Sequence, residues 1–420
     1  MRCIQTLALC AMALLLPGCQ RSAPPASSAG AARADYSPQA WVLPTSNVSG
    51  QPGLATTPDG RLLLSWIDST PGRRNALQFA SWDGSGRWQS APRTIVVGDS
   101  LVVDAANPPQ LAATSDGALW VHWLQKDPDS RNDLQLSRSV DGGFNWSPPL
   151  QVATAAQTTE LGFATLWPQD NHSVGMAWLD GEAVTTAAPT TPQTTTPQTI
   201  APTALHAAVF DANLQRSQAA TVDPRACDCC HVAVAVTARG PLLVYRDRSA
   251  TDIRDIAATR FDGTHWSAAR PVHVDDWKMS GCPVNGPAVA ASENQAIVGW
   301  YTAANQQPKL ELARSVDAGD NFAAPVVVDQ GDVVLGRAAV ALDAQQAWVA
   351  WLREDASGQS LWVARYSADL SRPLQRVKVA ALHGRGGVTG FPQLAVLAGH
   401  AYVVWTDVAG SSTQLHGAIL

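Results

Sequence analysis

The chain has 420 residues and a formal net charge of −6 at pH 7, because 35 acidic side chains outnumber 29 basic ones. The basic residues are scattered, whereas a protein that binds phosphate backbones needs them clustered, so this composition excludes nucleic acid as a partner. Beyond the first 18 residues no apolar run is as long as a membrane-spanning helix, and we expect any membrane attachment to use a lipid anchor.

The N-terminus has the pattern of a bacterial lipoprotein signal. Residues 1–18 carry one positive charge, an apolar run too short to span a bilayer, and small residues before Cys19, which predicts a signal peptide. Residues 16–19, Leu-Pro-Gly-Cys, resemble the lipobox that the lipoprotein signal peptidase cuts. The resemblance implies that Cys19 becomes the lipidated first residue; a cleaved secretory signal without a lipid is the alternative. Gln20, in place of Asp, favours the periplasmic side of the outer membrane, and residues 19–39 predict a flexible tether.

From residue 40 onward the chain repeats one unit seven times. Residues 52–66 align without gaps to residues 109–123, and every unit ends its second apolar run at a large aromatic residue. These anchors are Trp66, Trp123, Trp178, Tyr245, Trp300, Trp351 and Trp405. Each unit contains four short alternating runs separated by polar turns. Residues 40–420 are therefore predicted to form an all-β protein, a seven-bladed β-propeller with four-stranded antiparallel blades.

The two ends of the repeat predict how the ring closes. The last unit lacks a fourth run, and a spare apolar run at residues 40–43 precedes the first unit. We expect this N-terminal strand to complete the last blade, which removes the exposed sheet edges. The aromatic anchors are expected to pack blade against blade, with sugar-stacking platforms as the alternative. Residues 183–203 form a low-complexity Thr/Pro loop, interpreted as a neutral insertion or a lid over the channel mouth.

The turns between third and fourth strands carry a further motif. Residues 139–146, Ser-Val-Asp-Gly-Gly-Phe-Asn-Trp, fit the Asp-box pattern Ser-x-Asp-x-Gly-x-x-Trp, and residues 315–322 nearly do. The Asp of such a turn accepts backbone N–H bonds, and the aromatic residue packs between sheets. With these turns the sequence resembles the sialidase-like (neuraminidase-like, BNR-repeat) β-propeller superfamily over residues 40–420. The stretches CDCC, YRDRS and GCPVNGP resemble a bacterial subgroup of that superfamily, a resemblance that implies no particular activity.

Four cysteines remain once the signal peptide is removed and Cys19 is lipidated. They are Cys227, Cys229, Cys230 and Cys282. Counted from the aromatic anchors, Cys227 and Cys282 hold equivalent positions in adjacent blades, four residues before the innermost strand. We therefore expect all four sulfurs to converge at the mouth of the central channel.

Three interpretations of these sulfurs remain open. An even number of cysteines in an oxidising compartment favours two disulfides, with Cys227 or Cys229 bonded to Cys282. A metal site would use the four cysteines together with His231 or Asp228, a ligand set that suits Cu(I) or Zn(II). A redox-active pair would need a thiol whose pKa is lowered by Arg246 or Lys278.

The resemblance also raises the possibility of a sialidase. It implies an arginine cluster that holds a carboxylate, a tyrosine nucleophile paired with a glutamate, and an aspartate acid/base. The candidates are Tyr245, Arg246, Asp247, Arg248 and Arg254, with Asp255, Tyr301 and Glu160 as further choices. Local Arg–Asp pairs that fix the rim are the structural alternative.

Two departures from the enzyme pattern weaken this interpretation. No arginine occurs in residues 41–54, where the family places its first, and the family enzymes have six blades. We favour a non-hydrolytic scaffold that binds a metal, small ligand or glycan at the cysteine-rich mouth. A sialidase-like glycosidase and a scaffold for periplasmic proteins are the alternatives.

Overall fold

A computed structural model describes residues 36–70, 72–154, 161–181 and 203–420. The signal peptide, Cys19, nearly all of the tether, Glu160 and residues 183–202 lie outside this part. Residues Ser37–Leu420 form one compact unit. Within the described ranges no helix has the length and apolar character needed to cross a bilayer.

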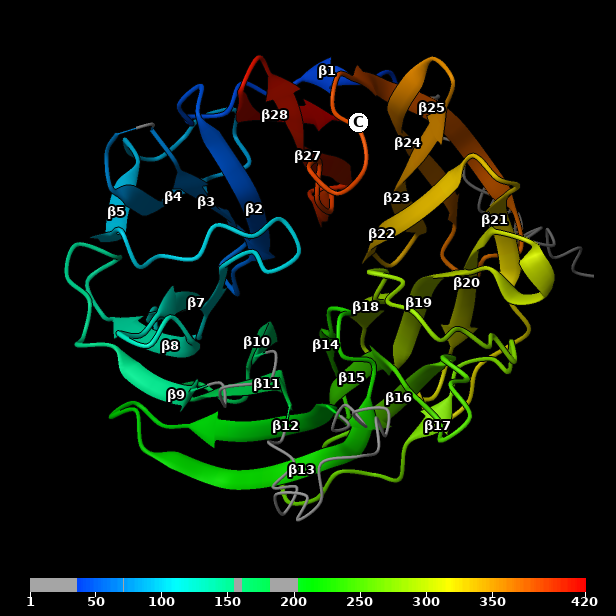
Figure 1. Cartoon of the computed structure of the whole chain (residues 1–420), viewed down its shortest axis with the longest axis horizontal. Helices are drawn as coiled ribbons and strands as arrows, with labels where there is room; N and C mark the ends of the chain where they lie inside the picture. Colours follow the sequence, from blue (N-terminus) through cyan, green and yellow to red (C-terminus); the bar gives the residue numbers. More distant parts are fainter. Residues whose placement is uncertain (1–35, 71, 155–160, 182–202) are drawn as a thin grey trace, which may run out of the picture. The chain divides into compact units, whose positions relative to one another are not determined.

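Seven separate sheets, each of four antiparallel strands, are arranged as a ring of blades (Figure 1). Blade one contains β2 (Ser49–Thr56), β3 (Leu62–Asp68), β4 (Asn75–Trp82) and β5 (Arg93–Gly98). Blade two contains β6 (Gln110–Ala113), β7 (Leu119–Lys126), β8 (Asn132–Ser139) and β9 (Leu150–Thr154). Blade three contains β10 (Leu161–Pro168), β11 (Val174–Gly181), β12 (Thr203–Phe210) and β13 (Arg216–Ala226). Blade four contains β14 (Ala233–Thr237), β15 (Gly240–Arg246), β16 (Ile256–Arg260) and β17 (Arg270–Pro271).

The remaining blades repeat the same order. Blade five contains β18 (Ala288–Ser292), β19 (Gln295–Thr302), β20 (Lys309–Ser315) and β21 (Val326–Gln330), with a short 3-10 helix η1 (Ala304–Gln306) between β19 and β20. Blade six contains β22 (Val334–Leu342), β23 (Gln346–Asp355), β24 (Gly358–Ser367) and β25 (Pro373–Leu382). Blade seven contains β26 (Gln393–Leu397), β27 (His400–Ala409) and β28 (Ser412–Ile419). The predicted seven-bladed propeller is confirmed.

The N-terminal strand closes the ring, as the spare run predicted. β1 (Gln39–Ala40) pairs antiparallel with β28, and the pairing starts one residue earlier than expected. The N–H of Trp41 continues the ladder by donating to the carbonyl of Gly417 at 2.9 Å. The Trp41 ring then stacks on Trp88, with 5.2 Å between ring centroids, and meets Tyr402 edge to face. Main-chain pairing and aromatic packing together hold the two chain ends in one sheet.

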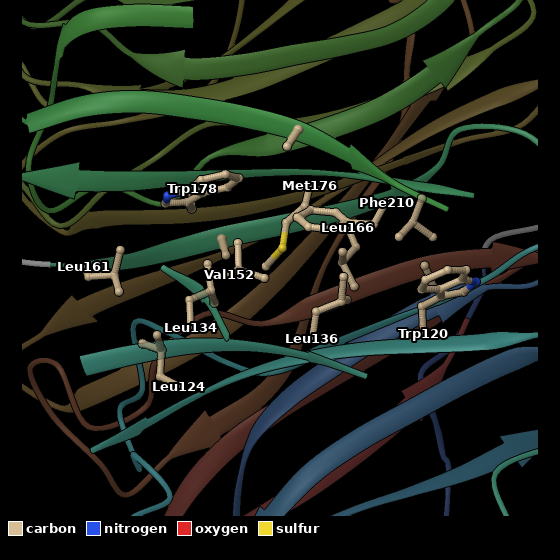
Figure 2. Close-up of a cluster of buried hydrophobic side chains, with 14 of the residues drawn as sticks. Trp120, Leu124, Leu134, Leu136, Val152, Leu161, Leu166, Met176, Trp178 and Phe210 are labelled. Carbon is tan, nitrogen blue, oxygen red and sulfur yellow. The ribbon is translucent and has the colours of Figure 1, made fainter. Parts of the chain in front are cut away.

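The hydrophobic core lies between the blades. All seven aromatic anchors occupy the second strand of their blade and are buried, which agrees with blade-to-blade packing. Figure 2 shows one such cluster, in which side chains of blades two and three pack together. It includes Trp120 and Leu124 of β7, Leu134 and Leu136 of β8, Leu166 of β10, Met176 and Trp178 of β11, and Phe210 of β12.

The Asp-box turns form as expected. Asp141 accepts hydrogen bonds from the backbone N–H groups of Phe144 and Asn145, and its bonds with Asn145 lower its pKa to about 2. The aromatic residue of the motif, Trp146, meets Phe79 of blade one edge to face at 6.0 Å. The motif therefore joins a tight turn to the neighbouring blade.

Three innermost strands carry a bulge, and in two of them the bulge is bound by an asparagine from the loop that leads into the preceding blade. Gln51, Phe163 and Arg337 have φ values of 52°, 51° and 54°, in the left-handed region, where the strand register shifts. The N–H of Phe163 donates to the side chain of Asn107 at 2.5 Å, and that of Arg337 donates to Asn285 at 2.7 Å. The asparagine of the GCPVNGP stretch thus holds the next blade in place.

Candidate functional site

The cysteines lie in the two loops that lead into blades four and five. Cys227, Cys229 and Cys230 follow the last strand of blade three, β13, and precede β14. Cys282 lies in the loop between β17 and β18. A disulfide joins Cys229 to Cys282 across 53 residues of sequence, with 6.0 Å between their Cα atoms. This is one of the two pairings considered in the disulfide interpretation.

The other two cysteines form a buried pair. Cys227 and Cys230 are unbonded, each is 1% exposed, and their Sγ atoms are 2.8 Å apart. The Sγ atom of Cys227 is also 3.9 Å from that of Cys229. Because Cys282 is exposed, the disulfide faces solvent while the thiol pair lies behind it. All four sulfurs are thus within a short distance of one another.

Two buried arginines surround the thiol pair. The guanidinium of Arg254 donates to Cys227 Sγ at 3.1 Å and to the Asp228 carboxylate at 3.1 Å. Arg246 donates to the backbone carbonyls of Asn285, Tyr301 and Arg254 at 2.6–3.0 Å. Both arginines are 1% exposed. Since Arg246 donates here only to neutral carbonyls, a thiolate at Cys227 supplies negative charge beside it.

These neighbours separate the acidities of the two thiols. The hydrogen bond that joins the two sulfurs, a backbone N–H of Cys229, and the charges of Arg254 and Arg246 together lower the pKa of Cys227 to about 6, against the opposing effect of burial. Burial raises the pKa of Cys230 well above its usual value. At neutral pH the pair therefore holds one thiolate and one thiol, with the negative charge on Cys227.

The structure brings three cysteine sulfurs together but places the ring of His231, a proposed metal ligand, elsewhere. Sulfur ligand atoms of Cys227, Cys229 and Cys230 all lie within 4.8 Å of one another. The ring of His231 instead packs against Phe391, 4.6 Å between centroids, and lines a central cavity of about 290 Å³. Burial lowers the pKa of His231 to about 4.

The cation beside the thiolate is a residue that the sequence interpretation had assigned to carbohydrate binding. Arg254, rather than exposed Lys278, contacts Cys227, and Arg246 adds its charge. Asp228 binds Arg254 and lies 3.7 Å from Arg248, so its charge is already shared between two arginines. Cys227 and Cys230 have C-x-x-C spacing, which is typical of a redox-active pair. The number of cysteines alone does not reveal this pattern.

The sialidase candidates are largely engaged inside the protein. Tyr245 is fully buried, its hydroxyl donates to Asp223, and burial raises its pKa. Arg248 pairs with Asp252 at 2.9 Å. Asp247 accepts the N–H of Arg248, and burial raises its pKa.

Two further sialidase candidates also form hydrogen bonds at the rim. Asp255 accepts the backbone N–H groups of Asp275, Asp276 and Trp277, although burial raises its pKa. Tyr301 offers its carbonyl to Arg246, and Glu160 lies outside the described residues. The described candidates of this loop thus take part in local hydrogen bonds and ion pairs.

The fold and site define a seven-bladed β-propeller with a buried thiol pair between two blades. No family model matches the sequence, and a comparison with curated proteins finds no match. Among solved structures, the polysaccharide lyase Uly1 is 8% identical, with a TM-score of 0.52 over 88% of this chain and 89% of that one.

Two other solved structures extend the comparison. A protein of unknown function from Dyadobacter fermentans is 14% identical, with a TM-score of 0.46 over 89% of this chain and 94% of that one. The intramolecular trans-sialidase from Ruminococcus gnavus is 12% identical, with a TM-score of 0.44 over the same two shares. At these identities the likeness concerns the fold alone.

Proposed function

We propose that this protein is a lipid-anchored, non-hydrolytic member of the sialidase-like propellers whose cysteine cluster performs thiol–disulfide exchange. The observation that carries the proposal is the 2.8 Å separation of the Cys227 and Cys230 sulfurs, with Arg254 donating to Cys227. A stabilised thiolate next to a resolving thiol is the arrangement that thiol–disulfide chemistry requires.

The exchange proceeds within the cluster. The Cys227 thiolate attacks Sγ of Cys229, forming a bond between these two sulfurs and releasing Cys282 as a thiolate. Cys230 gives its proton to that thiolate and attacks Sγ of Cys227, which closes a Cys227–Cys230 disulfide and releases Cys229. One disulfide breaks, one forms, and two electrons pass from the buried pair to the exposed pair. The step needs no external oxidant.

The exposed pair then reacts with a partner. Cys282 is exposed, whereas Cys227 and Cys230 are each 1% exposed. Once the internal exchange has made Cys229 and Cys282 thiols, they reduce an outside disulfide to two thiols and form the Cys229–Cys282 disulfide again. The substrate class is an accessible disulfide of a periplasmic protein or small molecule. Lipid on Cys19 would keep the reaction at the periplasmic side of the outer membrane.

Metal binding fits the observed bonding of the sulfurs less well. Cys229 is already bonded to Cys282, so it cannot act as a thiolate ligand in this state. A Cu(I) or Zn(II) site would require reduction of that disulfide and opening of the pair, so metal is the alternative outcome of the test.

Disulfide mapping tests the proposal. The mature protein, poised anaerobically at one disulfide per chain, is quenched with an alkylating reagent and its bonds are mapped by mass spectrometry. In the wild type we expect both the Cys229–Cys282 and the Cys227–Cys230 disulfide. In Cys230→Ser we expect only the Cys229–Cys282 disulfide of these two. The exposed control Ser280→Ala, two residues from Cys282, should match the wild type.

Two results would overturn the exchange mechanism. One is a Cys227–Cys230 disulfide that is absent at every redox poise. The other is protein purified with stoichiometric copper or zinc and four reduced cysteines. The same spectra test the anchor, since an N-terminal Cys19 peptide without acyl chains would exclude it.

A further inference from the structure

A second group of metal-binding residue types lies outside the cysteine cluster. His273 and Asp275 belong to the loop between β17 and β18, and Glu311 lies on β20. One ligand atom from each of the three lies within 4.8 Å of those of the other two. They line a cavity of about 230 Å³ together with Thr302 and Lys309. The three residues form no motif in the sequence, because Glu311 is far from the other two along the chain.

Glu311 is the strongest sign that this cavity binds a ligand. The residue is 6% exposed, and its Oε2 atom is buried without a hydrogen-bond partner among the described residues. A buried carboxylate oxygen that makes no hydrogen bond loses its hydration without compensation. Burial, and next the charge of Asp275, raise the pKa of Glu311, while the nearby charge of Lys309 opposes that shift.

Asp275 and His273 are already fixed in place. The Oδ1 atom of Asp275 is 2.7 Å from Nδ1 of His273, and its Oδ2 atom accepts a hydrogen bond from the Trp300 indole at 2.8 Å. The backbone N–H of Asp275 donates to Asp255. In the octahedral geometry typical of Mn²⁺, two adjacent ligands each about 2.1 Å from the ion would be about 3.0 Å apart, close to the His273–Asp275 separation. The second carboxylate oxygen, held by Trp300, orients the ligating one.

We propose that His273, Asp275 and Glu311 bind a divalent transition-metal ion such as Mn²⁺ or Zn²⁺. The ion replaces the proton between His273 and Asp275 and engages the unpartnered oxygen of Glu311. One imidazole nitrogen and two carboxylates form a harder ligand set than the thiolates, and they suit these ions. Three protein ligands leave further coordination positions for water or substrate in the cavity.

The proposed ion would also stabilise the loop that carries the cysteine site. Asp255 accepts the N–H groups of Asp275, Asp276 and Trp277, while the Trp277 carbonyl accepts the N–H of Arg254. The loop that would hold the ion is therefore bonded to the arginine that contacts the thiolate. The metal site does not depend on the exchange mechanism.

Manganese binding tests this site without interference from thiols, because Mn²⁺ prefers oxygen and nitrogen ligands. Full-length mature protein is freed of metal and titrated with Mn²⁺, with free ion followed by electron paramagnetic resonance and Zn²⁺ used as competitor. We expect one Mn²⁺ per chain, displaced by Zn²⁺. Glu311→Gln should weaken binding by about 100-fold or more, since even outer-shell changes cost 10–100-fold.

Control variants keep the result interpretable. Exposed Glu293→Gln makes the same chemical change away from the cavity and should bind as the wild type. His273→Gln, at a side chain 40% exposed, tests the site with little risk to folding. The proposal is wrong if the wild type binds no Mn²⁺ or Zn²⁺, or if Glu311→Gln and His273→Gln bind as tightly as Glu293→Gln.

Discussion

Cys227 shows at the residue scale how neighbours determine chemical behaviour. Its sulfur is hydrogen-bonded to Cys230 and accepts from Arg254, a residue of the loop after β15, while Arg246 adds a second buried charge. The sequence identified the cysteines and a dense run of arginines. It did not predict that Arg254 points at the thiol, because the direction of a side chain depends on how the loop folds back on itself.

Removing the Arg254 charge should raise the pKa of Cys227. In the reduced wild type, thiolate ultraviolet absorbance should be present above about pH 6 and lost as the pH falls through that value. Arg254→Gln keeps hydrogen-bond donors but removes the cation. As the pH falls, the thiolate absorbance of this variant should therefore be lost at a higher pH than in the wild type. Exposed Arg225→Gln, two residues from Cys227, is the matched control and should keep the wild-type midpoint. Equal midpoints in all three proteins would refute the role of Arg254.

At the scale of elements, the loop that leads into blade five joins two blades through Asn285. The backbone carbonyl of Asn285 accepts from Arg246. Its side-chain amide nitrogen donates to the Leu335 carbonyl at 2.9 Å, and its side-chain oxygen accepts from the backbone N–H of Arg337. Gly286 follows, where an added Cβ would lie 2.1 Å from the His231 carbonyl oxygen. The GCPVNGP stretch was recognised in the sequence only as part of a resemblance. Its role depends on contacts with blades four and six that no local pattern encodes.

Truncating Asn285 should loosen this junction. Asn285→Ala leaves the half-buried N–H of Arg337 and the carbonyl of Leu335 without their partner, so we expect the free energy of unfolding to fall by about 1–3 kcal/mol. Exposed Asn294→Ala should change it by less than about 0.5 kcal/mol. Denaturant unfolding of both variants gives the comparison. Equal losses would show that the Asn285 side chain does not join the blades.

At the scale of the whole molecule, ring closure joins the first strand to the last. β1 contributes two regular residues, so packing of Trp41 against Trp82, Trp88 and Tyr402 must supply much of the closing interaction. A propeller whose first and last strands separate would expose two sheet edges at once.

Trp41 should therefore contribute far more to the stability of the folded protein than its neighbour Val42. Trp41→Ala removes a side chain that is 3% exposed and should lower the free energy of unfolding by about 3–5 kcal/mol. Val42→Ala, at a residue 80% exposed, should have little effect. Urea unfolding, together with hydrogen exchange of β28, measures the difference. Similar stability of the two variants would mean that the ring does not depend on this closure.

The sequence alone determined the class of fold, the number of blades, the placement of the aromatic anchors and the closing strand. These features follow from short repeated patterns, in which each strand and turn is specified by residues close together in the chain. Tertiary structure decided which sulfurs pair, that Arg254 contacts Cys227, that His231 faces the central cavity, and that Glu311 meets His273 and Asp275. These arrangements depend on distances between loops of different blades and on side-chain directions, which arise only when the blades pack together.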